Sequence, residues 1–118
     1  MLTAQYTFVL EEILNSLKEI NKPPEDINEF NITITKDSNT YNILGYSYED
    51  FISNMDNLNV KYIRGHSIDS DPDGWISFKD GSWLEREYGE LISQGSYWEY
   101  KTCPTNKNIV FNTGLKLI

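Results

Sequence analysis

Residues 75–88 read WISFKDGSWLEREY, a stretch in which Asp80-Gly81 separates two runs rich in aromatic and apolar residues. Asp-Gly between two such runs is a strong short-range signal for a β-hairpin. A second turn-rich stretch, residues 89–95, leads into SYWEYK at residues 96–101. Together the three runs predict a three-stranded antiparallel meander between Trp75 and Lys101.

An amphipathic helix is predicted upstream of the meander, over residues 3–20. Its apolar residues recur every three or four positions and would bury one stripe, while glutamate, asparagine and lysine fill the other face. Pro23-Pro24 ends the helix, because proline removes a backbone donor and restrains the residue before it. We expect this helix to pack on the sheet.

A second hairpin and a short helix are predicted between the long helix and the meander. Residues 30–35 alternate Phe or Ile with Asn and Thr, and a turn at residues 37–39 separates them from residues 41–44. Ser47 with an acid three residues later is typical of a helix N-terminus. A two-turn helix is therefore expected from Ser47 to Met55.

Further strands are predicted over residues 60–63, 108–111 and 115–118. The length of 118 residues suits one domain and leaves no room for a second core. We therefore expect a single domain over residues 1–118, of the α+β class, with the N-terminal helix on an antiparallel sheet and a C-terminal β-meander.

Charge and cysteine content limit the classes of function. Ten Lys and Arg stand against 18 Asp and Glu, for a formal net charge of -8. Direct binding of nucleic acid is not expected, because it relies on basic residues that release counterions from the phosphates. A basic surface on a partner protein suits this charge better. The single Cys103 excludes an intramolecular disulfide and a multi-cysteine metal site.

The sequence also lacks the signatures of membrane insertion and of common enzymes. Two glutamates interrupt the N-terminal stretch MLTAQYTFVLEEILNSL, where a signal peptide needs an unbroken apolar segment. Glycine-rich nucleotide-binding motifs and zinc-protease and hydrolase motifs do not occur, and no nucleophile signature surrounds His66 or Cys103. We expect a cytoplasmic protein that is not an enzyme, has no cofactor and has no membrane partner.

The sharpest local pattern of carboxylates lies between Asp69 and Asp80. Asp69, Asp71 and Asp73 occupy the first, third and fifth positions of a loop that resembles an EF-hand, with Gly74 at the sharp turn and Asp80 last. The last ligand is usually a glutamate, however, and Asp-Pro-Asp-Gly equally suits a turn that leads into a strand. We favour the turn and expect no metal. A calcium- or magnesium-dependent site, structural or hydrolytic, is the alternative function.

Carboxylates and large aromatic residues are mixed along the predicted meander. Successive side chains of a strand point to opposite faces, so Trp83, Glu85 and Glu87 share one face, as do Tyr97 and Glu99 on the next strand. Aromatic residues anchor a partner and acids steer a basic one, which makes these five the candidate partner-binding residues. The alternative is a sheet whose second face is covered by the N-terminal helix.

The segments DGSWLEREY (residues 80–88) and YWEYK (residues 97–101) resemble a DGxWLERxEY…WEYK pattern of small phage- or prophage-encoded proteins without assigned function. The resemblance covers about a fifth of the chain. It implies a phage accessory protein in the cytoplasm of the bacterial host cell. Many such small acidic proteins inhibit host defence complexes, in an anti-CRISPR-like manner, by presenting carboxylates in place of nucleic-acid phosphates.

The sequence and the resemblance together predict a non-catalytic acidic binding protein. Its expected partner is a bacterial protein with a basic, nucleic-acid-binding surface, which the chain would block. A second copy of the chain, in a homodimer, is a further candidate partner.

Overall fold

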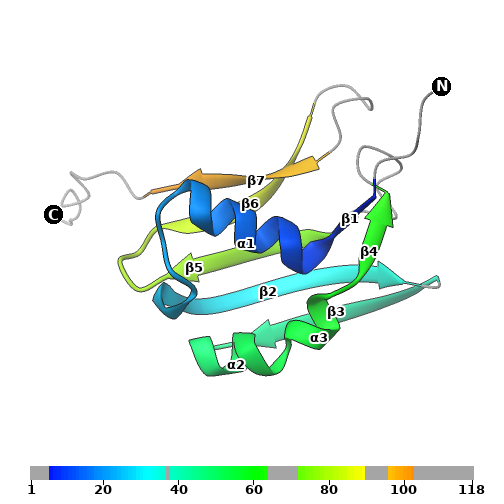
Figure 1. Cartoon of the computed structure of the whole chain (residues 1–118), viewed down its shortest axis with the longest axis horizontal. Coiled ribbons are helices and arrows are strands. Elements are labelled where there is room, and N and C mark those ends of the chain that lie inside the picture. The colour runs from blue at the N-terminus through cyan, green and yellow to red at the C-terminus, as the bar shows by residue number, and fades with distance from the viewer. Residues whose placement is uncertain (1–5, 37, 64–71, 90–95, 103–118) are drawn as a thin grey trace, which may run out of the picture.

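The computed structural model of the chain describes residues 6–36, 38–63, 72–89 and 96–102. Within these residues five strands form one antiparallel sheet in the order β3-β2-β5-β6-β7 (Figure 1). The strands are β2 (Ile27–Lys36), β3 (Asn39–Gly45), β5 (Asp73–Phe78), β6 (Trp83–Tyr88) and β7 (Ser96–Lys101). The predicted α+β class and the predicted meander, β5-β6-β7, are confirmed.

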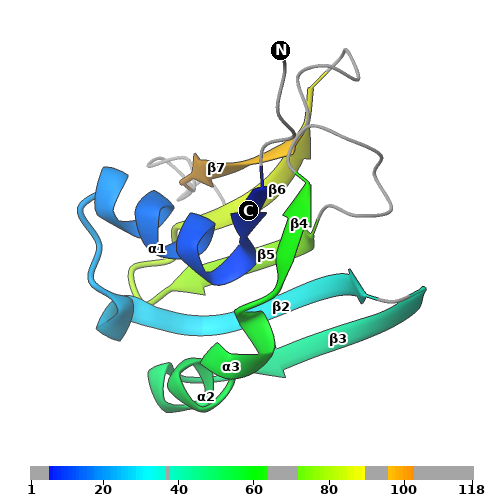
Figure 2. The ribbon, with the colours of Figure 1, turned by 45° about the vertical axis from the view of Figure 1, so that its right-hand side comes forward.

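The three α-helices of the described residues lie on one face of this sheet (Figures 1 and 2). The longest, α1 (Val9–Glu19), lies over the side of the sheet formed by β6 and β7, and α2 (Tyr48–Ser53) and α3 (Met55–Leu58) lie near β2 and β3. The short 3-10 helix η1 (Pro24–Asp26) connects α1 to β2. The predicted packing of an amphipathic helix on the sheet is therefore confirmed.

The N-terminal helix is shorter than its sequence pattern predicts, because α1 begins at Val9 and not at Thr3. The preceding residues form β1 (Tyr6–Phe8), which pairs antiparallel with β4 (Lys61–Ile63) in a separate two-stranded sheet. Aromatic and β-branched side chains favour extended backbone, and the strand partner satisfies backbone groups that a longer helix would have bonded internally. Residues 3–5 lie outside the described residues.

The other elements predicted within the described residues are confirmed with changes in length. The second hairpin is β2-β3, in which Ile32 lies opposite Ile43. Ser47 caps α2, because its Oγ accepts a hydrogen bond from the Asp50 backbone N–H at 3.2 Å. The strand predicted over residues 60–63 is β4. The strands predicted near the C-terminus, over residues 108–111 and 115–118, lie outside the described residues.

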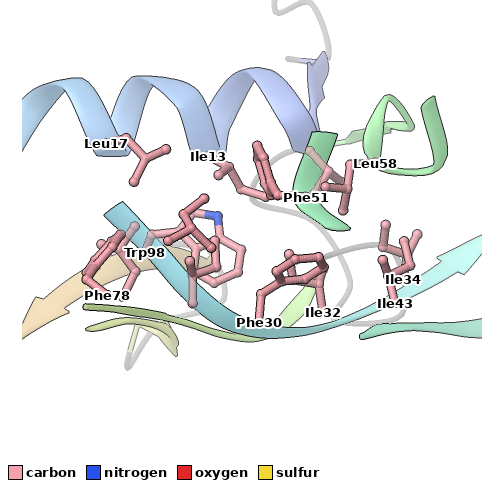
Figure 3. Packing of buried hydrophobic residues seen from close by; sticks show 14 of the residues in the cluster. Ile13, Leu17, Phe30, Ile32, Ile34, Ile43, Phe51, Leu58, Phe78 and Trp98 are labelled. Carbon is pink, nitrogen blue, oxygen red and sulfur yellow. The ribbon is translucent and has the colours of Figure 1, made fainter. Parts of the chain in front are cut away.

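Helices and sheet enclose a hydrophobic core (Figure 3). Ile13 and Leu17 of α1 point down toward the sheet, and Phe51 of α2 packs edge-on against Phe30 of β2, with ring centroids 5.7 Å apart. Burying a Leu, Ile or Phe side chain contributes roughly 1.5–3 kcal/mol. The sheet contributes the largest share of these residues: Ile27, Phe30, Ile32, Ile34, Ile43, Ile76, Phe78, Leu84 and Trp98.

The turn between β5 and β6 is the Asp-Gly turn that the sequence predicts. Phe78 N–H donates to the Ser82 carbonyl at 2.8 Å, so Lys79, Asp80 and Gly81 form the loop. Gly81 has a φ of 92°, a conformation that glycine adopts without steric cost. Glycine is also required at Gly74 on β5, where φ is 126° and a Cβ would overlap the carbonyl oxygen of β2 beside it.

Candidate protein-binding face

The face of the sheet away from the helices is lined by alternate residues of β5, β6 and β7. Leu84, Arg86 and Trp98 are buried on the helix side, so the residues between them in β6 and β7 point the opposite way. This places the five predicted partner-binding residues on one face. With Trp75 of β5 they form what we call the acidic aromatic patch: Trp75, Trp83, Glu85, Glu87, Tyr97 and Glu99.

Cross-strand register makes the patch continuous. Glu85 lies opposite Trp75 on one side and opposite Glu99 on the other. In the next row Glu87 lies opposite Tyr97. Residues directly opposite one another in an antiparallel pair have Cβ atoms roughly 4.5–5.5 Å apart, close enough for side-chain contact. Trp75, Glu85 and Glu99 therefore form one row across three strands.

Lys101 lies opposite Trp83 and organises the acids of the patch. Its Nζ donates to Glu87 Oε2 at 2.5 Å and lies 3.4 Å from Glu85 Oε1. Trp83 Nε1 also donates to Glu85 Oε1, at 3.0 Å. The hydrogen bond from Trp83, followed by that from Lys101, lowers the pKa of the Glu85 carboxyl, and the hydrogen bond to Glu87 raises the pKa of Lys101. The Glu85 carboxylate and the Lys101 ammonium group are therefore both charged at neutral pH.

The patch is accessible to a partner. Tyr97 is 42% exposed and Trp75 is 37% exposed. The alternative, in which the N-terminal helix covers this face, is wrong, because α1 lies on the same side as the buried Leu84 and Trp98 (Figures 1 and 3).

Trp75 belongs to the patch although the sequence prediction did not include it. Its position depends on the register of β5 against β6, which places it opposite Glu85. That register follows from the loop of Lys79, Asp80 and Gly81, and a shift of one residue would turn Trp75 to the other face. From the sequence, Trp75 could have been assigned to the patch by counting residues back from the loop of Lys79, Asp80 and Gly81.

Asp73 and Asp80 of the alternative calcium-type loop do not converge on one site. Asp73 begins β5 and Asp80 follows its end, and an extended strand of this length separates its ends by about 16 Å. Ligands of one Ca²⁺ lie about 2.3–2.6 Å from the ion, so these two residues cannot share it. Asp80 instead accepts a hydrogen bond from Lys22 Nζ at 2.7 Å. Asp69 and Asp71 lie outside the described residues.

Over residues 6–36, 38–63, 72–89 and 96–102, no three His, Cys, Asp or Glu side chains are grouped to hold a metal ion. His66 and Cys103 lie outside these ranges. In the same ranges no helix has the length and apolar character needed to cross a membrane. No protein family, no curated protein and no solved structure matches the chain. The geometry of the acidic aromatic patch is therefore the main support for a function.

Proposed function

We propose that the protein is a non-catalytic binding protein whose acidic aromatic patch binds a basic surface of a partner protein. The observation that carries the proposal is the row of Trp75, Glu85 and Glu99 across three strands, in which Trp75 and Glu99 are exposed and Glu85 is half-buried. An indole beside carboxylates suits an arginine, because the guanidinium stacks on the ring while its N–H groups reach the acid.

The charge of the patch supports a basic partner. Glu85 and Glu87 share Lys101, while Glu99 brings a further negative charge on the same face. A surface with excess carboxylates attracts a basic partner from a distance and speeds the encounter. Aromatic side chains then anchor the complex, because Trp and Tyr are enriched among the residues that dominate binding energy.

The lowered pKa of Glu85 supports a binding role over an acid–base role. A general acid at neutral pH needs a pKa raised toward the working pH. Hydrogen bonds from Trp83 and Lys101 move the Glu85 carboxyl in the opposite direction. Glu85 is thus suited to act as a permanent negative charge.

The resemblance to phage-encoded proteins suggests the class of partner. In this proposal the basic surface is the nucleic-acid-binding site of a bacterial defence complex in the host cytoplasm. Carboxylates held on a rigid sheet compete with phosphates for the same arginine and lysine side chains. The protein would then inhibit by occupying that site.

The test is a pull-down from bacterial lysate with equal amounts of immobilised wild type, Glu99→Lys and Glu49→Lys. Glu49 is exposed on α2, so its reversal makes the same change of charge away from the patch. We expect mass spectrometry to find proteins with basic surfaces that wild type and Glu49→Lys retain and that Glu99→Lys loses. The proposal is wrong if all three retain the same proteins, or if wild type retains none.

A further inference from the structure

A groove of about 370 Å³ runs between α1 and β7. Glu11, Asn15 and Glu19 line it from the helix, and Tyr97 and Trp98 line it from the strand. Figures 1 and 2 both show α1 beside β7. The lining residues run along α1 from Glu11 to Glu19 and reach β7 at Tyr97 and Trp98. The helix wall of the groove is therefore acidic and polar.

The strand that borders this groove has an open backbone edge within the described part of the chain. There β7 is the last strand of the sheet and pairs with β6 on one side only. An edge strand directs every second N–H and C=O away from its neighbour, which makes it a template for another strand. A segment that enters the groove can thus bond to backbone as well as to side chains.

Trp98 supplies a second and independent indication of a ligand. The residue is 9% exposed, and among the described residues its Nε1 is the buried side-chain donor without a hydrogen-bond partner. Figure 3 shows this nitrogen turned toward α1, on the side where the groove lies. A buried donor without an acceptor is unfavourable, so a ligand carbonyl within hydrogen-bond distance of Nε1 would be stabilised.

We infer that the groove binds an extended basic segment of a partner protein, which adds a strand to the edge of β7. Glu11 and Glu19 are eight residues apart on a helix, a rise of about 12 Å. Residues four apart on one face of a strand are about 13 Å apart. A segment with two lysines or arginines separated by three residues therefore places one basic side chain near Glu11 and the other near Glu19.

The groove and the acidic aromatic patch meet at Tyr97, which belongs to both. The inference therefore rests on the proposed function and gives the way in which the basic partner engages the sheet. Backbone hydrogen bonds along β7 provide affinity, and side chains on either side of the added strand provide selectivity.

The test uses a capped peptide, Thr-Lys-Val-Thr-Val-Lys-Thr, added to the ¹⁵N-labelled full chain and followed by NMR. The three tryptophans give separate indole N–H signals, and two of them, Trp75 and Trp83, report on the patch. We expect the Trp98 signal to move downfield and the outward β7 amides to exchange more slowly. Movement of Trp75 and Trp83 alone overturns this inference and leaves the proposed function standing, and no movement of any indole also overturns it.

Two control peptides carry methyl groups on the odd or on the even backbone nitrogens. A strand added to one edge uses only one set of its N–H groups, so one methylated peptide should bind and the other should not. Equal binding of both would show that the contact is purely electrostatic and would overturn the inference. Protection of β7 amides that increases with protein concentration, without peptide, would assign the edge to a second copy of the chain and overturn it too.

Matched variants test the acidic wall. The exposed pair Glu11→Gln with Glu19→Gln should weaken peptide binding about tenfold, since an exposed ion pair contributes up to about fivefold. Glu25→Gln with Glu49→Gln removes the same charge from exposed sites elsewhere and should leave the affinity near that of wild type. Equal affinity of both double variants would contradict the proposed occupant.

Discussion

Arg86 of β6 donates from Nη1 to Oε1 of Glu12 on α1 at 2.5 Å, although the two residues are 74 positions apart in the chain. The Arg86 side chain is fully buried and that of Glu12 is 8% exposed. Tyr62 of β4 donates to the same Glu12 oxygen, and Arg86 also donates to Ser96 of β7. This cluster joins α1, the small sheet and the large sheet.

Removing one member of the Glu12–Arg86 pair should destabilise the fold severely. Arg86→Met leaves a buried carboxylate without its counterion, which costs about 3–5 kcal/mol. The double variant Glu12→Leu with Arg86→Met should recover part of this loss, because an apolar pair leaves no buried charge. Urea unfolding followed by circular dichroism measures both free energies of unfolding.

Lys101→Met is the control, because Lys101 is likewise paired with carboxylates, those of Glu85 and Glu87, but is partly exposed. We expect this variant to lose no more than about 1 kcal/mol. A single Arg86→Met variant as stable as Lys101→Met would contradict the assignment of Arg86 as a buried charge.

Tyr97→Ala should weaken partner binding by about 2 kcal/mol or more while the thermal unfolding transition remains. Tyr97 is 42% exposed, so the fold does not depend on burying its ring. Tyr46→Ala removes an exposed ring outside the patch and serves as the control. Isothermal titration with the partner recovered in the pull-down measures the affinities. Loss of the unfolding transition in Tyr97→Ala would identify the ring as part of the core and remove it from the interface.

Association with the basic partner should slow by at least about tenfold between about 0.05 and 0.5 M NaCl. Salt screens charges over a Debye length of about 10 Å at 0.1 M, which suppresses electrostatic steering. Surface plasmon resonance gives the association rate. Glu99→Gln should reduce the salt dependence and Glu49→Gln should not. An association rate that is independent of salt would favour an apolar interface.

Acid should weaken the contact between Asp80 and Lys22. The hydrogen bond from Lys22, followed by those from Ser82, holds the pKa of the Asp80 carboxyl well below its usual range. A carboxyl with a lowered folded pKa contributes stability above its unfolded pKa, and this stability is lost as the pH falls through the folded pKa. Between about pH 4 and pH 2 the melting temperature of wild type should therefore fall more than that of Asp80→Asn. Lys22→Met should flatten the profile in part, because the hydrogen bonds from Ser82 to Asp80 remain. Parallel profiles for all three proteins would refute the linkage.

Millimolar Ca²⁺ should leave the melting temperature within about 1 °C of its value in EDTA, because β5 holds Asp73 and Asp80 apart. A cation that binds only the folded protein at a hundred times its Kd would add about 2.7 kcal/mol, a shift of several degrees. Differential scanning fluorimetry makes the comparison. A rise of the melting temperature on addition of Ca²⁺ that Asp73→Ala or Asp69→Ala abolishes would make the alternative cation site the leading function.

Local patterns in the sequence are sufficient for the fold class, for the meander and for the sharing of one face by Trp83, Glu85 and Glu87. The alternation of side chains is a property of the extended backbone itself and needs no knowledge of the neighbouring strand. The Asp80-Gly81 turn likewise depends on the conformations that these residues favour. For the same reason the five predicted residues of the patch fall on one surface once β6 and β7 pair.

The start of α1, the inclusion of Trp75 in the patch and the pairing of Glu12 with Arg86 were decided only by the tertiary structure. Tyr6–Phe8 continues a helical pattern in sequence but pairs with β4, a partner more than 50 residues away. Trp75 reaches the patch through a register that a slip of one residue would reverse. In the sequence Arg86 resembles any charged residue of an amphipathic strand, and its burial depends on Glu12, which α1 places against it. Such contacts form between segments distant in sequence, and their free energy depends on three-dimensional packing that no local pattern encodes.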